Sequence, residues 1–297
     1  MSGTRRGRGN GRSCKGYFDD IERRRKGKLH PELLTIGPLT IHTYGVFYAL
    51  GILTAIFLAE YLYQKNGGKA GTFQDMGFFV VIGILVGARA LFILVNLEYF
   101  LKTPLDVFKI WNGGLVFYGG LIGGSLAFIL TAKVKRLDLW PLADTVAPAV
   151  ALGHAIGRIG CFFAGSCYGT PTTVPWAVTF TDPRSLATGV LGVPVHPTQL
   201  YASALLLLLT VVLLRIRSHA RFPGQVITSY GAMYGIIRFG LEFLRGDPRG
   251  SVEILGATLS TSQAISLIIV PLSLAGYVYL SQRSLMRRAR PVLGIRS

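Results

Sequence analysis

Seven long stretches of the chain consist almost entirely of apolar residues, and short polar segments separate them. A helix rises about 1.5 Å per residue, so about 20 apolar residues cross a hydrocarbon core about 30 Å thick. Backbone in lipid must satisfy its own hydrogen bonds, so each stretch is predicted to form a transmembrane helix. The stretches are Ile41–Tyr63, Phe73–Val95, Gly113–Ala132, Val146–Phe163, Leu200–Leu214, Val226–Leu244 and Ala264–Leu280.

The fifth stretch is marginal in length, and it reaches spanning length if the preceding His196–Gln199 joins the helix. The pattern therefore predicts an all-α integral membrane protein with about seven transmembrane helices. We expect one membrane domain at residues 34–282, preceded by a basic tail at 1–33 and followed by a basic tail at 283–297. The first tail is expected to be disordered, or to be absent because translation starts downstream.

Composition supports a membrane protein. Hydrophobic residues make up 51% and charged residues 15% of the 297 residues, and the charged share is well below the quarter typical of soluble domains. The mean hydropathy is +0.47. These values exclude an ordinary soluble domain.

The net charge of +17 would suit a nucleic-acid partner, but the placement of the basic residues argues against one. With seven spans, alternate loops share a face, and the positive-inside rule puts the more basic face in the cytoplasm. The C-terminus is therefore predicted to be cytoplasmic and the loop at 164–195 external, although the basic N-terminal tail favours the reverse. The more basic face holds Lys65, Lys69, Lys133, Lys135, Arg136, Arg215, Arg217, Arg221, Arg283, Arg287, Arg288 and Arg290, and the other loops hold Lys102, Lys109, Arg184, Arg245 and Arg249.

Targeting and cysteine signals are weak. No apolar segment with a small-residue cleavage site follows the basic tail, so no signal peptide is predicted. Cys14, Cys161 and Cys167 are too few and too scattered for a disulfide framework or a metal site. Cys161 and Cys167 either form a bridge on an oxidising face of the membrane or remain unpaired buried thiols.

Two clusters of polar residues lie inside apolar stretches, where such residues usually face a cavity or a partner. In the fourth stretch, His154, Arg158 and Cys161 fall on one helix face. In the sixth, a polar stripe covers about three turns and consists of Tyr234, Arg238, Glu242 and Arg245. Guanidinium groups match phosphate oxygens and stay charged when desolvated, so the two clusters favour an anionic ligand.

A structural role is the alternative for both arginines. Arg238 and Glu242 are spaced to neutralise each other, and Arg158 could pair with Asp144. Because both clusters are rich in glycine and tyrosine, we favour a functional role over a structural one.

Two further segments carry weaker signals. In His196-Pro197-Thr198-Gln199-Leu200-Tyr201, Pro197 suits the first turn of a helix and His196 would then cap it. The segment from Asn112 to Gly124 contains paired glycines around Tyr118. Such glycines often mean only close helix packing, but the Tyr118 hydroxyl is placed to reach the same cavity as the arginines.

Taken in order, these segments resemble prolipoprotein diacylglyceryl transferases. The resemblance covers about Leu34 to Leu280 and rests on the combination of motifs, since each motif alone is unspecific. The motifs are Tyr44-Gly45, Gly87–Arg89, the Gly-Gly-Leu segment from Gly113, Gly157-Arg158-Ile159-Gly160, the segment from His196 to Tyr201, and the segment from Tyr234 to Arg245.

The resemblance implies an activity. The family moves the diacylglyceryl group of phosphatidylglycerol to the lipobox cysteine of prolipoproteins at the outer face of the bacterial inner membrane, and glycerol-1-phosphate leaves. It implies seven helices around a lipid-binding cavity, phosphatidylglycerol, prolipoprotein signal peptides and membrane lipids as partners, and no cofactor, metal or nucleic acid. Catalysis is assigned to Arg238, Arg158, Tyr118 and His196, and substrate binding to Arg158, Tyr44, Gly113, Gly114, Cys161, Gly169, Tyr234, Glu242 and Arg245.

Several positions depart from the family pattern. Cys161 stands where many members have asparagine, Ser166 where they have a carboxylate, and Ala202 where a glutamate is common. Tyr118 aligns with a histidine that would suit a base for the incoming thiol, and a free tyrosine with a pKa of about 10 is a poor base. The proton acceptor therefore stays open among Tyr118, His196 and Glu242, with ionisation of the thiol in the field of the arginines as a further route.

Two other functions remain open. One is a diverged relative that binds phosphatidylglycerol or modifies another acceptor. The other is a transporter of an anionic amphiphile, because arginines at membrane depth also mark transport paths. Inverted internal repeats would favour transport, and the sequence has no convincing one.

Overall fold

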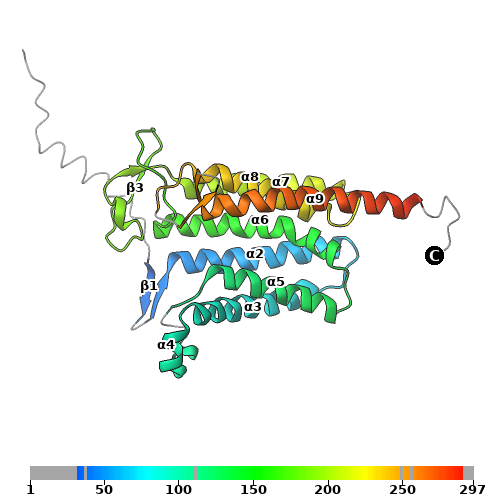
Figure 1. The fold of residues 1–297 in the computed structure, drawn as a ribbon, viewed down its shortest axis with the longest axis horizontal. Helices are drawn as coiled ribbons and strands as arrows, with labels where there is room; N and C mark the ends of the chain where they lie inside the picture. The colour runs from blue at the N-terminus through cyan, green and yellow to red at the C-terminus, as the bar shows by residue number, and fades with distance from the viewer. Residues whose placement is uncertain (1–31, 37–38, 110–112, 248–249, 255–256, 290–297) are drawn as a thin grey trace, which may run out of the picture.

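The seven apolar stretches each form a long helix, and the helices lie side by side (Figure 1). The computed structural model describes residues 32–36, 39–109, 113–247, 250–254 and 257–289, so most of the predicted N-terminal tail lies outside the described residues. The prediction of an all-α integral membrane protein is confirmed. The long helices are α2 (Thr43–Lys65), α3 (Thr72–Val95), α5 (Phe117–Val134), α6 (Leu139–Ala164), α7 (Thr198–Ser218), α8 (Gln225–Glu242) and α9 (Thr261–Ala289).

Six of these helices are long and apolar enough to span a membrane, namely α2, α3, α5, α6, α7 and α9. The predicted count of seven spans is therefore not confirmed. The exception is α8, whose 18 residues include Arg238, Glu242 and several tyrosines and glycines that lower its hydropathy. Helix α9 continues to Ala289, past the expected domain boundary at residue 282.

Short elements gather at the end of the bundle where α6 and α8 finish (Figure 1). None of them was predicted, because the apolar pattern that identified the long helices does not reach into these connections. They are α4 (Leu97–Lys102), the 3₁₀ helices η1 (Pro104–Phe108) and η3 (Thr188–Val190), and three antiparallel hairpins: β1 (Glu32–Ile36) with β2 (Leu39–His42), β3 (Val178–Thr179) with β4 (Pro194–Val195), and β5 (Ser251–Ile254) with β6 (Ala257–Ser260).

Glycines set the closest helix contacts. Helix α2 packs against α6, and α3 packs against α5. A Cβ atom on Gly51 would lie 2.5 Å from the carbonyl oxygen of Gly153, and one on Gly87 would collide with the carbonyl of Gly119. Lipid offers little hydrophobic drive for helix association, so such backbone-to-backbone contact supplies much of the packing energy. The Gly-Gly segment of α5 thus has an observed packing role.

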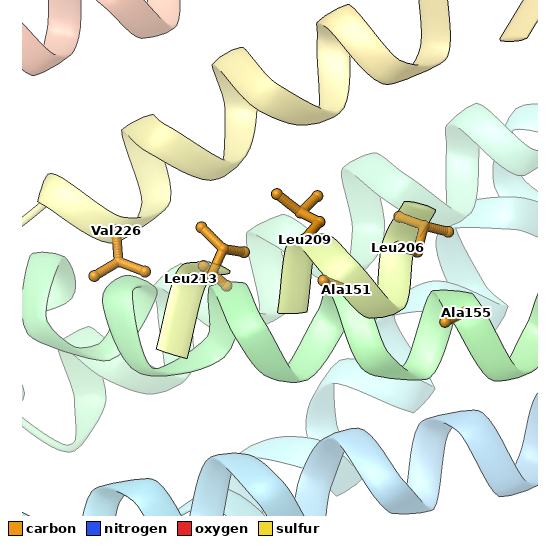
Figure 2. Packing of buried hydrophobic residues seen from close by; sticks show 7 residues of the cluster. Ala151, Ala155, Leu206, Leu209, Leu213 and Val226 are labelled. Atoms are coloured by element: carbon orange, nitrogen blue, oxygen red, sulfur yellow. The ribbon is translucent and has the colours of Figure 1, made fainter. Parts of the chain in front are cut away.

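An apolar cluster joins α6, α7 and α8 (Figure 2). Small side chains on α6, among them Ala151 and Ala155, allow Leu206, Leu209 and Leu213 of α7 to approach closely. This contact holds α6 and α8 next to each other, which places their polar faces together at one end of the bundle.

Polar clamps fasten the other end, which also carries the basic turns after α2, α5 and α7 (Figure 1). The Glu60 carboxylate accepts the backbone N–H groups of Gly71 at 2.6 Å and Phe73 at 2.8 Å, at the start of α3. Asp144 on α6 accepts the N–H groups of Gly224 at 2.7 Å and Ile227 at 2.9 Å, at the start of α8. These carboxylates satisfy N–H groups that a helix start leaves without intrahelical partners.

Arg217 adds a link between helices at the same end. Its Nη2 donates to the Leu62 carbonyl of α2 at 3.0 Å and to the Thr145 hydroxyl of α6 at 3.2 Å. The basic end of α2 is thereby tied to α6 and α7.

Candidate functional site

Arg158 and His154 lie one turn apart on the same face of α6, as their spacing predicts. Nε of Arg158 donates to Nε2 of His154 at 3.1 Å. The alternative in which Arg158 pairs with Asp144 is wrong. Asp144 lies near the opposite end of α6, and its carboxylate accepts the two N–H groups that start α8.

Arg238 and Glu242 form an ion pair on α8. Nη1 of Arg238 lies 2.5 Å from the Glu242 carboxylate, and the two side chains are 12% and 6% exposed. Nη2 of Arg238 donates to the Ser262 hydroxyl of α9 at 2.7 Å. The arginine is thus held from two sides in a fixed orientation.

The two polar faces meet through aromatic contacts. The His154 ring of α6 lies 5.6 Å from the Tyr234 ring of α8, and Tyr234 stacks on Tyr230 at 5.6 Å. Arg238 follows Tyr234 by one turn on α8. The structure therefore places Arg158 and Arg238 on neighbouring helices, with His154 and Tyr234 between them.

Arg245 does not extend the α8 stripe as predicted. Helix α8 ends at Glu242, and Arg245 forms an isolated antiparallel bridge with Gly169. Its guanidinium binds Asp247 through two hydrogen bonds of 2.9 and 3.0 Å. The helix stops early because backbone groups of this segment bond instead to the loop after α6: Thr170 donates to Leu244 at 2.9 Å.

Gly169 lies where three chain segments approach. A Cβ atom there would lie 2.6 Å from the His196 carbonyl oxygen and 2.8 Å from that of Leu244. Its N–H donates to the His196 carbonyl at 3.0 Å. Any larger residue would separate these segments, so the observed role of Gly169 is to join them.

His196 was predicted to cap α7, and that prediction is wrong. The capping position is Pro197, without a side-chain hydrogen bond to the helix. The His196 backbone instead pairs with Gly169 and Thr170, which pulls it out of the helix. Its Nδ1 lies 3.3 Å from the hydroxyl of Tyr201, which also accepts from Trp176 Nε1 at 2.6 Å.

Gly113 and Gly114 lie in the connection before α5, both with positive φ angles of 83° and 80°. Their carbonyls accept hydrogen bonds from Nη1 of Arg89 at 2.8 and 3.3 Å, and Nε of Arg89 binds the Val107 carbonyl at 3.0 Å. The buried Arg89 thus ties Gly113 and Gly114 to η1. We assigned it no role from the sequence, although an arginine alone in an apolar helix is itself a signal.

Tyr118 lies in the first turn of α5 and is 45% exposed. Among the described residues, its one ring contact is with Phe117, at 5.7 Å. The structure does not bring it into contact with Arg158 or Arg238.

Tyr44 lies in the first turn of α2, next to the end of α6 that carries Arg158. A Cβ atom on Gly160 of α6 would lie 3.2 Å from the Tyr44 carbonyl oxygen. The Tyr44 ring is 45% exposed and stacks on His42 at 5.9 Å.

Cys161 and Cys167 form no disulfide bridge with each other, and the two thiols are half-buried and hydrogen-bonded to each other. Cys167 lies outside the helix with a φ angle of 62°, a conformation that few residues other than glycine adopt. The hydrogen bond from Cys161 lowers the pKa of Cys167, and the guanidinium groups of Arg245 and Arg158 act in the same direction against the effect of burial. Of the two alternatives, the one without a disulfide bridge is confirmed.

The family model of prolipoprotein diacylglyceryl transferase matches residues 31–279 of this chain. The chain belongs to the prolipoprotein diacylglyceryl transferase family. All helices and site residues described above lie within the match, apart from the end of α9.

Curated relatives agree with this assignment. The chain is 38% identical over 242 residues to a phosphatidylglycerol–prolipoprotein diacylglyceryl transferase of Clostridium tetani, covering 82% of this chain and 94% of that protein. Proteins of the same name from Bordetella parapertussis and a Nostoc species are 36% and 35% identical, over 84% and 85% of this chain and 93% and 90% of theirs. The membership of the family predicted from the motifs is confirmed.

Proposed function

We propose that this protein transfers the diacylglyceryl group of phosphatidylglycerol to the thiol of a lipobox cysteine in prolipoproteins. Membership of the family carries the proposal, because relatives of nearly the same length carry the name of this reaction. Two arginines on neighbouring helices, at one end of a membrane bundle, suit a lipid with one phosphodiester.

The chemistry of the transfer requires positive charge near the oxygen that leaves. The cysteine loses its proton, and the thiolate sulfur attacks the primary glyceryl carbon that carries the phosphate ester. A C–S bond forms, the C–O bond breaks with its electron pair on oxygen, and glycerol-1-phosphate leaves. Negative charge therefore grows on the departing oxygen, and preorganised cations aimed at it lower the barrier.

We assign Arg158 to the lipid headgroup and Arg238 to the phosphate during transfer. Arg238 suits the second task because Glu242 and Ser262 hold it in place before substrate arrives. Three of the other predicted contacts, Tyr44, Tyr234 and Gly169, lie at the same end of α6 and α8. The base stays open among Tyr118, His196 and Glu242.

The positions of the basic turns and of the two arginines support an orientation of the protein in the membrane. The basic turns lie at the end of the bundle opposite Arg158 and Arg238 (Figure 1). By the positive-inside rule, the basic end faces the cytoplasm. We therefore place the C-terminus in the cytoplasm and the site at the outer face of the bacterial inner membrane, where lipobox signal peptides emerge.

Transfer can be tested directly with purified protein in liposomes. With phosphatidylglycerol and a lipobox peptide, we expect a peptide whose mass increases by one diacylglyceryl group, together with free glycerol-1-phosphate. A peptide with serine in place of cysteine and liposomes of phosphatidylethanolamine are the controls, and neither should yield product.

Complementation of a strain depleted of its own transferase tests the same proposal in cells. Growth should be restored by the wild-type chain. Binding of phosphatidylglycerol without peptide modification would contradict the proposal and favour a lipid-binding relative. Movement of lipid between leaflets without modification would contradict it and favour a transporter.

A further inference from the structure

His154 lies at the junction of the two arginines and has no role in the reaction as described so far. It is half-buried on α6, one turn before Arg158. Its Nε2 atom receives the Nε hydrogen bond of Arg158 at 3.1 Å, and its ring contacts Tyr234 of α8 at 5.6 Å. This residue thus touches a headgroup arginine and the helix that carries the other arginine.

The hydrogen bond fixes the chemical state of the imidazole. Arginine is a donor only, so Nε2 of His154 must be the acceptor. An imidazole can accept at Nε2 only when it is neutral and carries its proton on Nδ1. A protonated His154 would lose this bond and would add a third positive charge beside Arg158 and Arg238.

The choice of donor atom on Arg158 also matters. A guanidinium binds a phosphate most strongly through two parallel N–H groups. The bond to His154 uses Nε, the donor nearest the helix, and no hydrogen bond to the two Nη groups is found among the described residues. The imidazole therefore restrains rotation of the guanidinium and leaves its outer edge, with both Nη groups, for a ligand.

We infer that His154 is a positioning residue for Arg158: its neutral imidazole holds the guanidinium so that the two Nη groups face the phosphodiester of phosphatidylglycerol. The inference rests on the proposed function for the identity of the lipid. It assigns His154 no proton transfer, since its Nε2 lone pair is already engaged by Arg158 and the thiol proton goes to another group.

Three substitutions separate positioning from packing. His154→Gln places an amide oxygen near the position of Nε2, so an acceptor for Arg158 is retained. His154→Asn has the same chemistry but is one carbon shorter, so its oxygen falls short. His154→Phe keeps the ring contact with Tyr234 and removes the acceptor.

Affinity for phosphatidylglycerol, measured in nanodiscs without any peptide, is the main readout. We expect His154→Phe and His154→Asn each to weaken binding about tenfold, because a hydrogen bond to a charged group is lost. His154→Gln should stay within about threefold of wild type. In transfer assays the loss should appear in KM for the lipid more than in kcat.

A double-mutant cycle with Arg158→Ala gives the second readout. If His154 acts through Arg158, His154→Phe should cause no further loss of affinity in the Arg158→Ala protein. An equal loss in both backgrounds would overturn the inference. So would wild-type affinity for His154→Phe, or a loss for His154→Gln as large as that for His154→Asn.

The binding readout keeps the inference separate from the proposed function. A wild-type protein that binds phosphatidylglycerol but transfers nothing would refute the proposed reaction and leave the positioning of Arg158 testable. A wild-type protein that does not bind phosphatidylglycerol at all would refute both.

Discussion

Gln199 at the start of α7 donates its side-chain amide to the backbone carbonyl of Ser166 at 2.8 Å, across 33 residues of sequence. Its neighbour Thr198 donates its hydroxyl to the Cys167 carbonyl at 2.7 Å. Both side chains are almost fully buried, with 1% and 3% exposed. The His-Pro-Thr-Gln motif therefore holds the segment that follows α6, next to Arg158 and Arg245.

Thr198→Val should destabilise the protein more than Thr210→Val. Both threonines are buried on α7 and donate to a carbonyl at 2.7 and 2.8 Å. Thr198 binds a loop carbonyl, whereas Thr210 binds Leu206 within its own helix, where that carbonyl keeps a backbone partner. We expect about 1–3 kcal/mol for Thr198→Val and less than about 0.5 kcal/mol for Thr210→Val.

Equilibrium unfolding in detergent micelles measures both variants. Gln199→Leu should behave like Thr198→Val, since it also leaves a loop carbonyl without its donor. Equal losses of stability for Thr198→Val and Thr210→Val would show that the hydrogen bond from α7 to the loop stabilises the protein no more than a bond within the helix does.

Arg238→Lys should reduce transfer by about 10²-fold or more while the protein still inserts and folds, since loss of one preorganised donor at a developing negative charge typically has this effect. Lysine keeps the charge but cannot bind Glu242 and Ser262 through separate nitrogens as Arg238 does. Initial rates in liposomes at saturating phosphatidylglycerol are the measurement. Ser262→Ala is the matched control and should lose far less, because the ion pair with Glu242 remains. Wild-type turnover by the lysine variant would show that the guanidinium of Arg238 does not stabilise the transition state.

Tyr118→Phe should lower the rate by no more than about tenfold, corresponding to about 1.4 kcal/mol. The Tyr118 ring is 45% exposed and contacts Phe117, so its hydroxyl is not held against the arginines. Loss of a general base would instead cost about 10²–10⁴-fold.

The pH–rate profile of Tyr118→His distinguishes these cases. If the position handles the thiol proton, histidine should raise activity and shift the optimum to lower pH. We expect an unchanged profile, which would leave His196, Glu242 or solvent as the acceptor.

The seven helices could be predicted because each is a long apolar stretch, and hydropathy is a property of neighbouring residues in sequence. The end of α8 could not be predicted from hydropathy. The spacing of Arg238, Glu242 and Arg245 fits a continuing helix, but backbone groups after Glu242 pair with Tyr168 and Thr170 instead. That competition involves residues about 75 positions apart, and the local pattern carries no sign of it.

The residues of the candidate site divide in the same way into those that could be predicted from the sequence and those that could not. Arg158 and Arg238 were found because a charge inside an apolar stretch is costly and therefore informative. The link through His154 and Tyr234 required the packing of α6 on α8, which is set by Ala151, Ala155 and the leucines of α7. Residues of the connecting loops, such as Gly169 and His196, have their roles fixed by backbone pairing that only the fold reveals.

Cys167 should react with iodoacetamide at a rate that changes less between pH 6 and pH 8 than the rate of an ordinary thiol does. Its pKa is lowered by the hydrogen bond from Cys161, with help from Arg245 and Arg158, so more of the thiol is present as the reactive thiolate at pH 6 than in an ordinary cysteine. An ordinary thiol, with a pKa of about 8.5, would lose close to tenfold in rate for each pH unit below that value.

Cys161→Ala removes the hydrogen-bond donor and should raise the pKa of Cys167, so alkylation at pH 6 should slow by about tenfold or more. The labelled peptide is identified by mass spectrometry in a Cys14→Ser background. A tenfold rise in the wild-type rate per unit between pH 6 and pH 8 would contradict the lowered pKa.

The clamps formed by Glu60, Asp144 and Arg217 give the two ends of the bundle different mechanical properties. At the basic end, directional hydrogen bonds fix α2 to α3, α6 to α8 and α7 to α2. Near Arg158, α2 meets α6 through the stacked rings of Phe47 and Phe163 and through the close approach of Gly160 to Tyr44. The basic end therefore resists rotation of one helix against another through bonds that fix both distance and direction, whereas the contact of α2 with α6 near Arg158 rests on the shapes of the packed side chains.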